Sequence, residues 1–182
     1  MARILFVTTA TQAGPIRFPD WVSDMVSVDV FVLNPQGFEL DPTDVPTVRE
    51  SFAYTSETGI GKDGFPFLVF RAYNETLRRS FRELLRWGSW DALIIDGVVS
   101  AAPLMGDHGL DLPRGLSWVV YRERPEDHAK FAQEAKWYHV KRWVNRWRLA
   151  RWHRLLSAKA AEVIKENRPQ LRAIFSEHDT AS

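Results

Sequence analysis

The sequence predicts a three-layer α/β fold, in which a mostly parallel sheet lies between helices. Short, fully apolar segments recur along the 182 residues, and such segments are typical of strands that are buried on both faces of a parallel sheet. Segments with helical periodicity separate them. Alternation of this kind favours a parallel sheet with helices on both of its faces.

Four apolar segments are the expected strands of the central sheet. They are residues 4–7, 28–33, 92–95 and 118–121. We expect them to lie side by side and to point the same way, so that the loops that leave them converge on one crevice. A further strand is expected at residues 51–55, inside a segment rich in Pro, Gly, Asp and Thr that is otherwise interpreted as loop.

Helical periodicity is found in three places. Residues 67–87 repeat apolar side chains at intervals of three and four, and Gly88 follows as a C-terminal cap. Ser100 is placed to cap the start of a second helix. After Pro125 the pattern predicts a long C-terminal helical region that reaches about residue 165. We therefore expect one domain over residues 1–165, followed by a short helix and a frayed tail over 166–182.

Composition limits the classes of function. The chain has no Cys, which excludes disulfides and thiolate metal sites, and its His residues lack metal-ligand spacing. No metal or cofactor is therefore expected. The apolar start of the chain is too short for a secretory signal, and no run of about 18 apolar residues is present. The cytoplasm is the expected location.

Basic charge is concentrated after residue 129. Residues 130–154 contain eight Lys or Arg and one acid, whereas the whole chain has a net charge of only +1. On a helical wheel, one broad face holds Trp137, Val140, Trp143, Val144, Trp147, Ala150 and Leu155. The opposite face is basic. Trp together with basic residues on a helix suits an anionic membrane surface, but the same Trp face can instead pack on the sheet. Nucleic acid is the least favoured partner, because no known binding module accompanies the charge.

Polar residues follow three of the expected strands. Asp96 ends one strand, where it can accept a hydrogen bond from a sugar hydroxyl or cap the next helix. Arg122 and Arg124 can bind phosphate or carboxylate, and Glu123 between them can act as a base. The alternative is a solvated charged turn. The first loop lacks G-x-G-x-x-G, and the match at residues 59–64 has no strand-to-helix turn around it, so no dinucleotide site is expected.

Four segments resemble glycosyltransferase family 4 and its relatives of the GT-B fold. Residues 1–9 resemble the opening strand of that family, and residues 81–97 resemble its helix that ends in (W/F/Y)-D-x-(V/I)-x-x-(D/H)-(G/S). Residues 118–128 resemble its Y-R-x-x-N-x-E-H segment, and residues 148–164 resemble its helix Y-E-R-x-L-L-x-x-A-D-x-V-I. The chain is thus similar to the Rossmann-like N-terminal domain of these two-domain enzymes.

The resemblance implies the acceptor-binding half of a glycosyltransferase. Such an enzyme transfers a sugar from a nucleotide-sugar donor to a glycan or a lipid-linked acceptor, and a separate domain or subunit binds the donor. The family's Gly-Gly is reduced here to Gly14, its Asn is Pro125 and its helix Glu is His153. Activity of the chain alone is therefore not expected, and no catalytic residue is assigned.

The resemblance also places particular residues. The implied acceptor-binding residues are Thr9, Gly14, Asp96, Arg122, Glu123 and His128. The expected membrane or partner surface comprises Trp137, Lys141, Arg142, Trp143, Arg146 and Trp147, and a peripheral position at the inner membrane face would follow from it. The alternative, from another class of function, is a non-catalytic Rossmann-like module that binds a partner protein or a small ligand.

Overall fold

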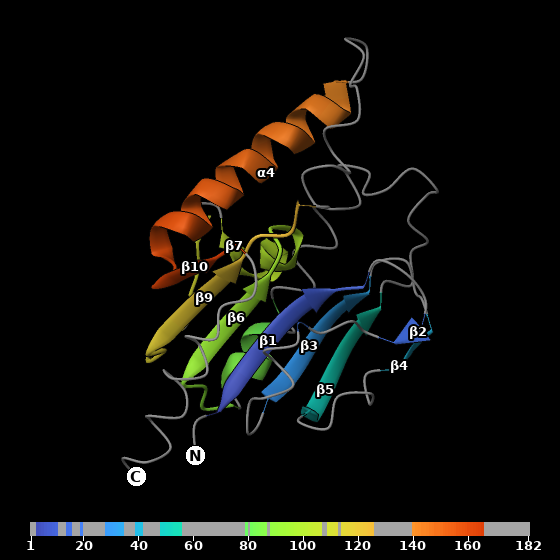
Figure 1. Ribbon diagram of the computed structural model, residues 1–182, viewed down its shortest axis with the longest axis vertical. Helices are drawn as coiled ribbons and strands as arrows, with labels where there is room; N and C mark the ends of the chain where they lie inside the picture. Colours follow the sequence, from blue (N-terminus) through green and yellow to red (C-terminus); the bar gives the residue numbers. More distant parts are fainter. Residues whose placement is uncertain are drawn as a thin grey trace.

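A six-stranded sheet forms the centre of the computed structural model, and every neighbouring pair of its strands is parallel (Figure 1). The structure describes residues 3–10, 14–15, 19, 28–34, 39–41, 48–55, 79, 81–86, 88–106, 109–112, 114–125 and 140–165. In sheet order the strands are β5 (Val48–Thr55), β3 (Val28–Asn34), β1 (Ile4–Thr9), β6 (Ala92–Asp96), β9 (Trp118–Arg122) and β10 (Glu162–Ile164).

The structure confirms the α/β character and the mostly parallel sheet. The four strands expected at the centre lie side by side as β9, β6, β1 and β3, and all of them point the same way. The strand expected at residues 51–55 is β5, which starts three residues earlier, at Val48. Each of these segments pairs with a neighbour because its backbone groups need partners once its apolar side chains are buried.

The order of the strands reverses once. Numbered along the chain, the six strands follow the order 3-2-1-4-5-6 across the sheet. The chain moves outward from β1 to β5, crosses back to β6 beside β1, and then moves outward again to β10. The loops that leave β1 and β6 therefore part in opposite directions at the middle of the sheet, which is the arrangement that opens a crevice in sheets of this kind.

Both faces of the sheet are buried. All six residues of β1 and all five of β6 are buried, and their side chains alternate between two apolar clusters. Leu5 and Leu93 belong to one cluster, whereas Phe6 and Ile94 belong to the other. This two-sided burial explains why residues 4–7 of β1 and 92–95 of β6 are apolar throughout instead of alternating between apolar and polar residues.

A helix covers part of the first of these faces, where residues 81–86 are helical. The Phe81 ring meets Phe31 of β3 edge-on, with the ring centroids 5.0 Å apart. Gly88 follows this helix, as expected, and its N–H donates to the Leu84 carbonyl. A Cβ at Gly88 would overlap the Trp90 ring, so this position needs glycine. Most of the rest of the helix expected over 67–87 lies outside the described residues.

A helix stands near Ser100 as expected, but the prediction that Ser100 caps its start is wrong. A six-residue 3-10 helix, η1 (Val99–Leu104), stands there, and the antiparallel strands β7 (Met105–Gly106) and β8 (Gly109–Leu110) follow it. The Ser100 hydroxyl does not cap this helix, since it donates backward to the Asp96 carbonyl at 2.6 Å. Two further short strands, β2 (Gly14–Pro15) and β4 (Leu40–Asp41), pair in parallel within segments expected to be loop.

The C-terminal helical region is shorter than predicted. Helix α4 covers Val140–Lys159, and the chain then turns into β10, whose three residues pair with β9. The prediction of helix to about residue 165 is therefore wrong, because the open edge of β9 takes residues 162–164 as a strand. Residues 126–139 and 166–182, where the start of this region and the terminal helix and tail were expected, lie outside the described residues.

Helix α4 packs with a different face from the one that its tryptophans suggest. Leu149, Trp152 and Leu156 are buried against the sheet and η1. Trp143 and Trp147 are 67% and 53% exposed, so packing of the Trp143–Trp147 face on the sheet is wrong. The buried residues repeat at intervals of three and four and form a separate stripe. In the described part of the chain, no helix has both the length and the apolar character to cross a membrane.

This packing predicts that two apolar truncations on α4 differ sharply in cost. Leu156→Ala removes a fully buried side chain and should lower the free energy of unfolding by about 2–5 kcal/mol. Trp147→Ala, the matched control, removes a larger but mostly exposed side chain and should cost less than about 1 kcal/mol. Urea unfolding measures both values. Equal costs, or a greater cost at Trp147, would contradict the orientation of α4.

Candidate functional site

Polar side chains gather at the carboxyl ends of β1, β6 and β9, where the strand order reverses. Asp96 pairs directly with Arg122 in the β6–β9 register, and Thr8 follows the Val7–Ile95 pair of β1 and β6. Since side chains alternate along a strand, Thr8, Asp96 and Arg122 all project from the same face as Phe6, Ile94 and Val120. The register alone therefore brings one hydroxyl, one carboxylate and one guanidinium together across three strands.

Asp96 is the centre of this cluster. Its side chain is 2% exposed, and Thr8 Oγ1 donates to Asp96 Oδ2 at 2.9 Å. Arg122 Nη1 donates to Asp96 Oδ1 at 2.7 Å, and Arg124 Nη1 lies 3.5 Å from Asp96 Oδ2. The carboxylate thus contacts side chains of β1 and β9 in the described structure, and it does not cap η1. A buried carboxylate requires such partners, because an unpaired buried charge is strongly unfavourable.

A second set of hydrogen bonds supports Asp96 from the opposite side of the strands. Ser100 Oγ is bonded to Thr9 Oγ1 at 2.8 Å and donates to the Asp96 carbonyl. Gly97 turns the chain out of β6 with a φ of 83°, a left-handed conformation that glycine adopts without strain. Its N–H donates to the Arg122 carbonyl at 2.9 Å. These contacts fix the direction in which the chain leaves β6.

Two positively charged side chains, Arg122 and Arg124, surround the single negative charge of Asp96. Arg122 and Arg124 share one carboxylate, and their side chains are 24% and 11% exposed. Arg124 also donates to the Thr9 carbonyl at 3.4 Å. Arg122 Nε is buried and has no hydrogen-bond partner among the described residues. A guanidinium has five N–H donors, so Arg122 can bind Asp96 and an oxygen of a ligand together.

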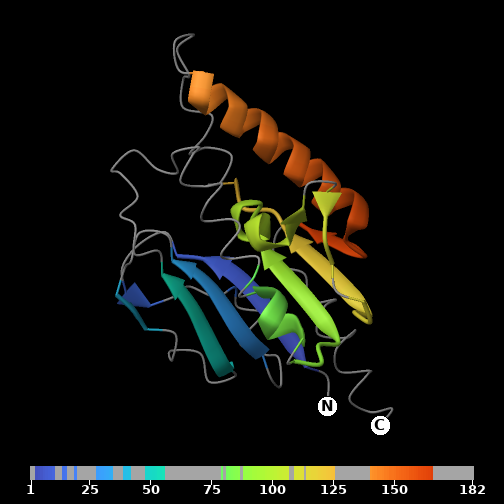
Figure 2. The same ribbon diagram turned by 180° about the vertical axis from the view of Figure 1, so that it is seen from behind.

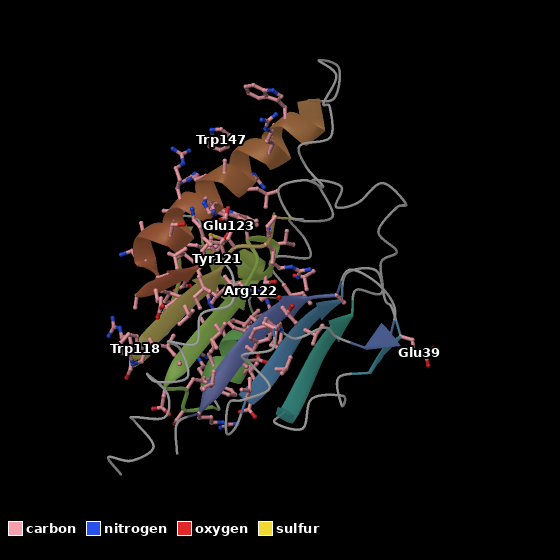
Figure 3. The ribbon with its side chains drawn as sticks, viewed as in Figure 1. Glu39, Trp118, Tyr121, Arg122, Glu123 and Trp147 are labelled. Atoms are coloured by element: carbon pink, nitrogen blue, oxygen red, sulfur yellow. The ribbon has the colours of Figure 1, made fainter. Side chains whose placement is uncertain are left out.

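The structure brings together some of the residues predicted from the sequence and separates others. Thr9, Asp96 and Arg122 lie within the cluster. Glu123 lies next to Arg122 (Figure 3), and its N–H donates to the Ile164 carbonyl. Gly14 belongs to β2, which lies with β4 beyond β5, at the other edge of the sheet from β9 (Figure 2). Gly14 therefore does not join the cluster. His128 lies outside the described residues.

The expected surface on α4 is described in part. Trp143, Arg146 and Trp147 are exposed. Lys141 and Arg142 lie in α4, although only their backbone is described, and Trp137 is outside the described residues.

Three members of the cluster were not predicted as site residues. Thr8 and Ser100 are fully or almost fully buried, and Arg124 was considered as a binder of phosphate or carboxylate but was not among the expected acceptor-binding residues. A usable signal existed for Ser100, because it lies four residues after Asp96, at the spacing that allows a return hydrogen bond across a turn. To predict that Thr8 belongs to the cluster, the register between β1 and β6 must be known.

A second charged group lies at the amino ends of the strands. Arg3 donates from Nε to Asp29 at 2.8 Å and from its backbone N–H to Asp91 at 2.7 Å. Its guanidinium lies 4.2 Å from the centre of the Trp90 ring. These contacts join the starts of β1, β3 and β6. This group holds the amino ends of the strands together. It is not a candidate ligand site, because ligands of open parallel sheets bind beyond the carboxyl ends of the strands.

The described residues contain no group of three His, Asp or Glu that could hold a metal ion. No protein-family model, curated protein or solved structure matches the chain.

The buried cluster predicts that Asp96 contributes strongly to stability. Asp96→Asn leaves two guanidinium groups without their shared carboxylate and should lower the free energy of unfolding by on the order of 3 kcal/mol. Asp111→Asn is the control, since the Asp111–Arg82 pair is about half exposed and should contribute less than about 1 kcal/mol. Chemical denaturation compares them. A loss at Asp96 no larger than that at Asp111 would show that the cluster is not formed.

Proposed function

We propose that this chain is the acceptor-binding, Rossmann-like domain of a glycosyltransferase. The observation that carries the proposal is the cluster of Thr9, Asp96, Arg122 and Arg124 where the strand order reverses. The order 3-2-1-4-5-6 is that of Rossmann-type sheets, and burial of both faces favours a three-layer domain. The resemblance of the sequence to glycosyltransferase family 4 supplies the class of reaction.

The chemistry of the cluster favours a ligand rich in oxygen. The Arg122 guanidinium has five N–H donors and its side chain is 24% exposed, and such donors bind phosphate, carboxylate or hydroxyl oxygens. The Arg124 side chain is held against Asp96 and the Thr9 carbonyl, which orients its charge toward the same place. A sugar, with or without a phosphate, presents oxygens of this kind.

Acceptor binding would contribute to transfer by positioning. In such reactions the rate depends on alignment of the acceptor hydroxyl with the donor and on stabilisation of charge on the leaving phosphate. In this proposal the described cluster holds the acceptor, which is a glycan or a lipid-linked sugar. A second domain or subunit holds the nucleotide sugar, so transfer requires both.

A non-catalytic module that binds a small ligand is the second candidate, because the same cluster can hold a ligand without any transfer. The two functions differ in one measurable respect. An acceptor-binding domain supports transfer when a donor-binding partner is supplied, whereas a binding module does not.

The proposed site predicts that Arg122 determines affinity for phosphorylated sugars. Glucose 6-phosphate should bind more tightly than glucose, and Arg122→Gln should weaken its binding about tenfold or more, because a charge-assisted hydrogen bond is lost. Isothermal titration and saturation-transfer NMR measure this effect. Arg86→Gln is the control, since Arg86 is exposed on the helix of residues 81–86 and should leave binding unchanged.

Two results would contradict the proposal. The first is that neither phosphorylated nor neutral mono- and disaccharides bind the wild-type chain. The second is that Arg122→Gln and Arg86→Gln have the same effect. Sugar transfer by the purified chain alone would retain the glycosyltransferase but would remove the need for a separate donor-binding domain.

A further inference from the structure

We propose that α4 docks on an anionic phospholipid surface through the side that faces away from the sheet. This outward face of α4 comprises Trp143, Arg146, Trp147, Arg151 and Arg154, all of which are exposed. The proposal is independent of the sugar site, since it depends on other residues.

The two tryptophans are the first observation. They lie one helical turn apart and are 67% and 53% exposed, and they are the exposed large apolar side chains in the described part of the chain. Trp147 projects from the side of α4 that is turned away from the sheet (Figure 3). Leu149, Trp152 and Leu156 anchor the opposite side. The burial of that anchor means that α4 presents its tryptophans in a fixed orientation.

Charge is the second observation. The 20 residues of α4 contain seven Lys or Arg and no acid. Arg146, Arg151 and Arg154 lie on the same face as the tryptophans, and the Arg151 guanidinium is 5.9 Å from the centre of the Trp147 ring. No acidic side chain of α4 screens this face. It is therefore complementary to a surface that is both anionic and able to accept indole rings.

A bilayer with anionic headgroups meets both requirements. Trp side chains favour the boundary between headgroups and acyl chains, and each basic residue near such a surface strengthens attraction. The phosphates of a nucleic acid would also match the charge of this face. The boundary between headgroups and acyl chains matches the charge and also takes up the two exposed indole rings.

Co-sedimentation with vesicles tests the proposal. The full chain should sediment with vesicles of phosphatidylcholine containing 30% phosphatidylglycerol, about tenfold or more better than with phosphatidylcholine alone, and salt should weaken this binding. Trp143→Ala/Trp147→Ala and Arg146→Glu/Arg154→Glu should each reduce partitioning about tenfold or more. The matched control is Arg86→Glu/Arg114→Glu, which makes the same change of charge at exposed residues outside α4.

The first part of a second measurement uses the wild-type chain and does not depend on the folding of variants. Vesicles of the same composition with brominated acyl chains should quench its tryptophan fluorescence, and Trp143→Phe/Trp147→Phe should lose most of the quenching. Absence of sedimentation and quenching with anionic vesicles would overturn the proposal. So would equal binding to neutral vesicles, or equal losses in the α4 and control variants. Binding to a mixed-sequence oligonucleotide in place of vesicles would overturn it in favour of nucleic acid.

Discussion

The parallel pairing of β1 with β6 is the constraint on which the rest of the structure depends. These strands are separated by more than eighty residues, yet Ile4 pairs with Ala92 and Val7 with Ile95. Because β3 and β5 add to one side of β1 and β9 and β10 to the other side of β6, this single contact creates the reversal of strand order. It also places Thr8 beside Asp96, which no local feature of either segment would do.

The two edges of the sheet use charge differently. At the amino edge, the Arg3 guanidinium pairs with the Asp29 carboxylate and lies over the Trp90 ring, while the Arg3 backbone N–H donates to Asp91. At the carboxyl edge, one buried carboxylate, Asp96, is shared between two guanidinium groups. The first arrangement joins the starts of β1, β3 and β6, whereas the second places two cations around one buried anion.

The parts of the fold that could be predicted are those that depend on local sequence. Buried strands such as residues 92–95 are recognisable because burial on both faces requires apolar residues throughout. Strand β10 was not predictable in this way, since residues 162–164 become a strand only because the edge of β9 is open beside them. The sequence left the orientation of α4 open, because the helix carries two apolar stripes: the sheet buries Leu149, Trp152 and Leu156, whereas Trp143 and Trp147 are exposed. Asp96 and Arg122 were predictable because each ends a recognisable strand. Thr8 was not, because it meets Asp96 only through the register between β1 and β6.

The carboxyl end of β9 connects the Asp96 cluster to α4. Alternation along the strand sends Tyr121 and Arg122 to opposite faces of the sheet. The Tyr121 hydroxyl is bonded to His153 Nδ1 of α4 at 3.0 Å, and their rings meet edge-on, whereas Arg122 binds Asp96. Tyr121 is thus bonded to α4 and Arg122 to Asp96, so α4 and the Asp96 cluster are fixed relative to each other through two consecutive residues. A surface that binds the outward face of α4 would therefore hold the carboxyl edge of the sheet in a defined orientation, which suits a domain whose ligand is presented by that same surface.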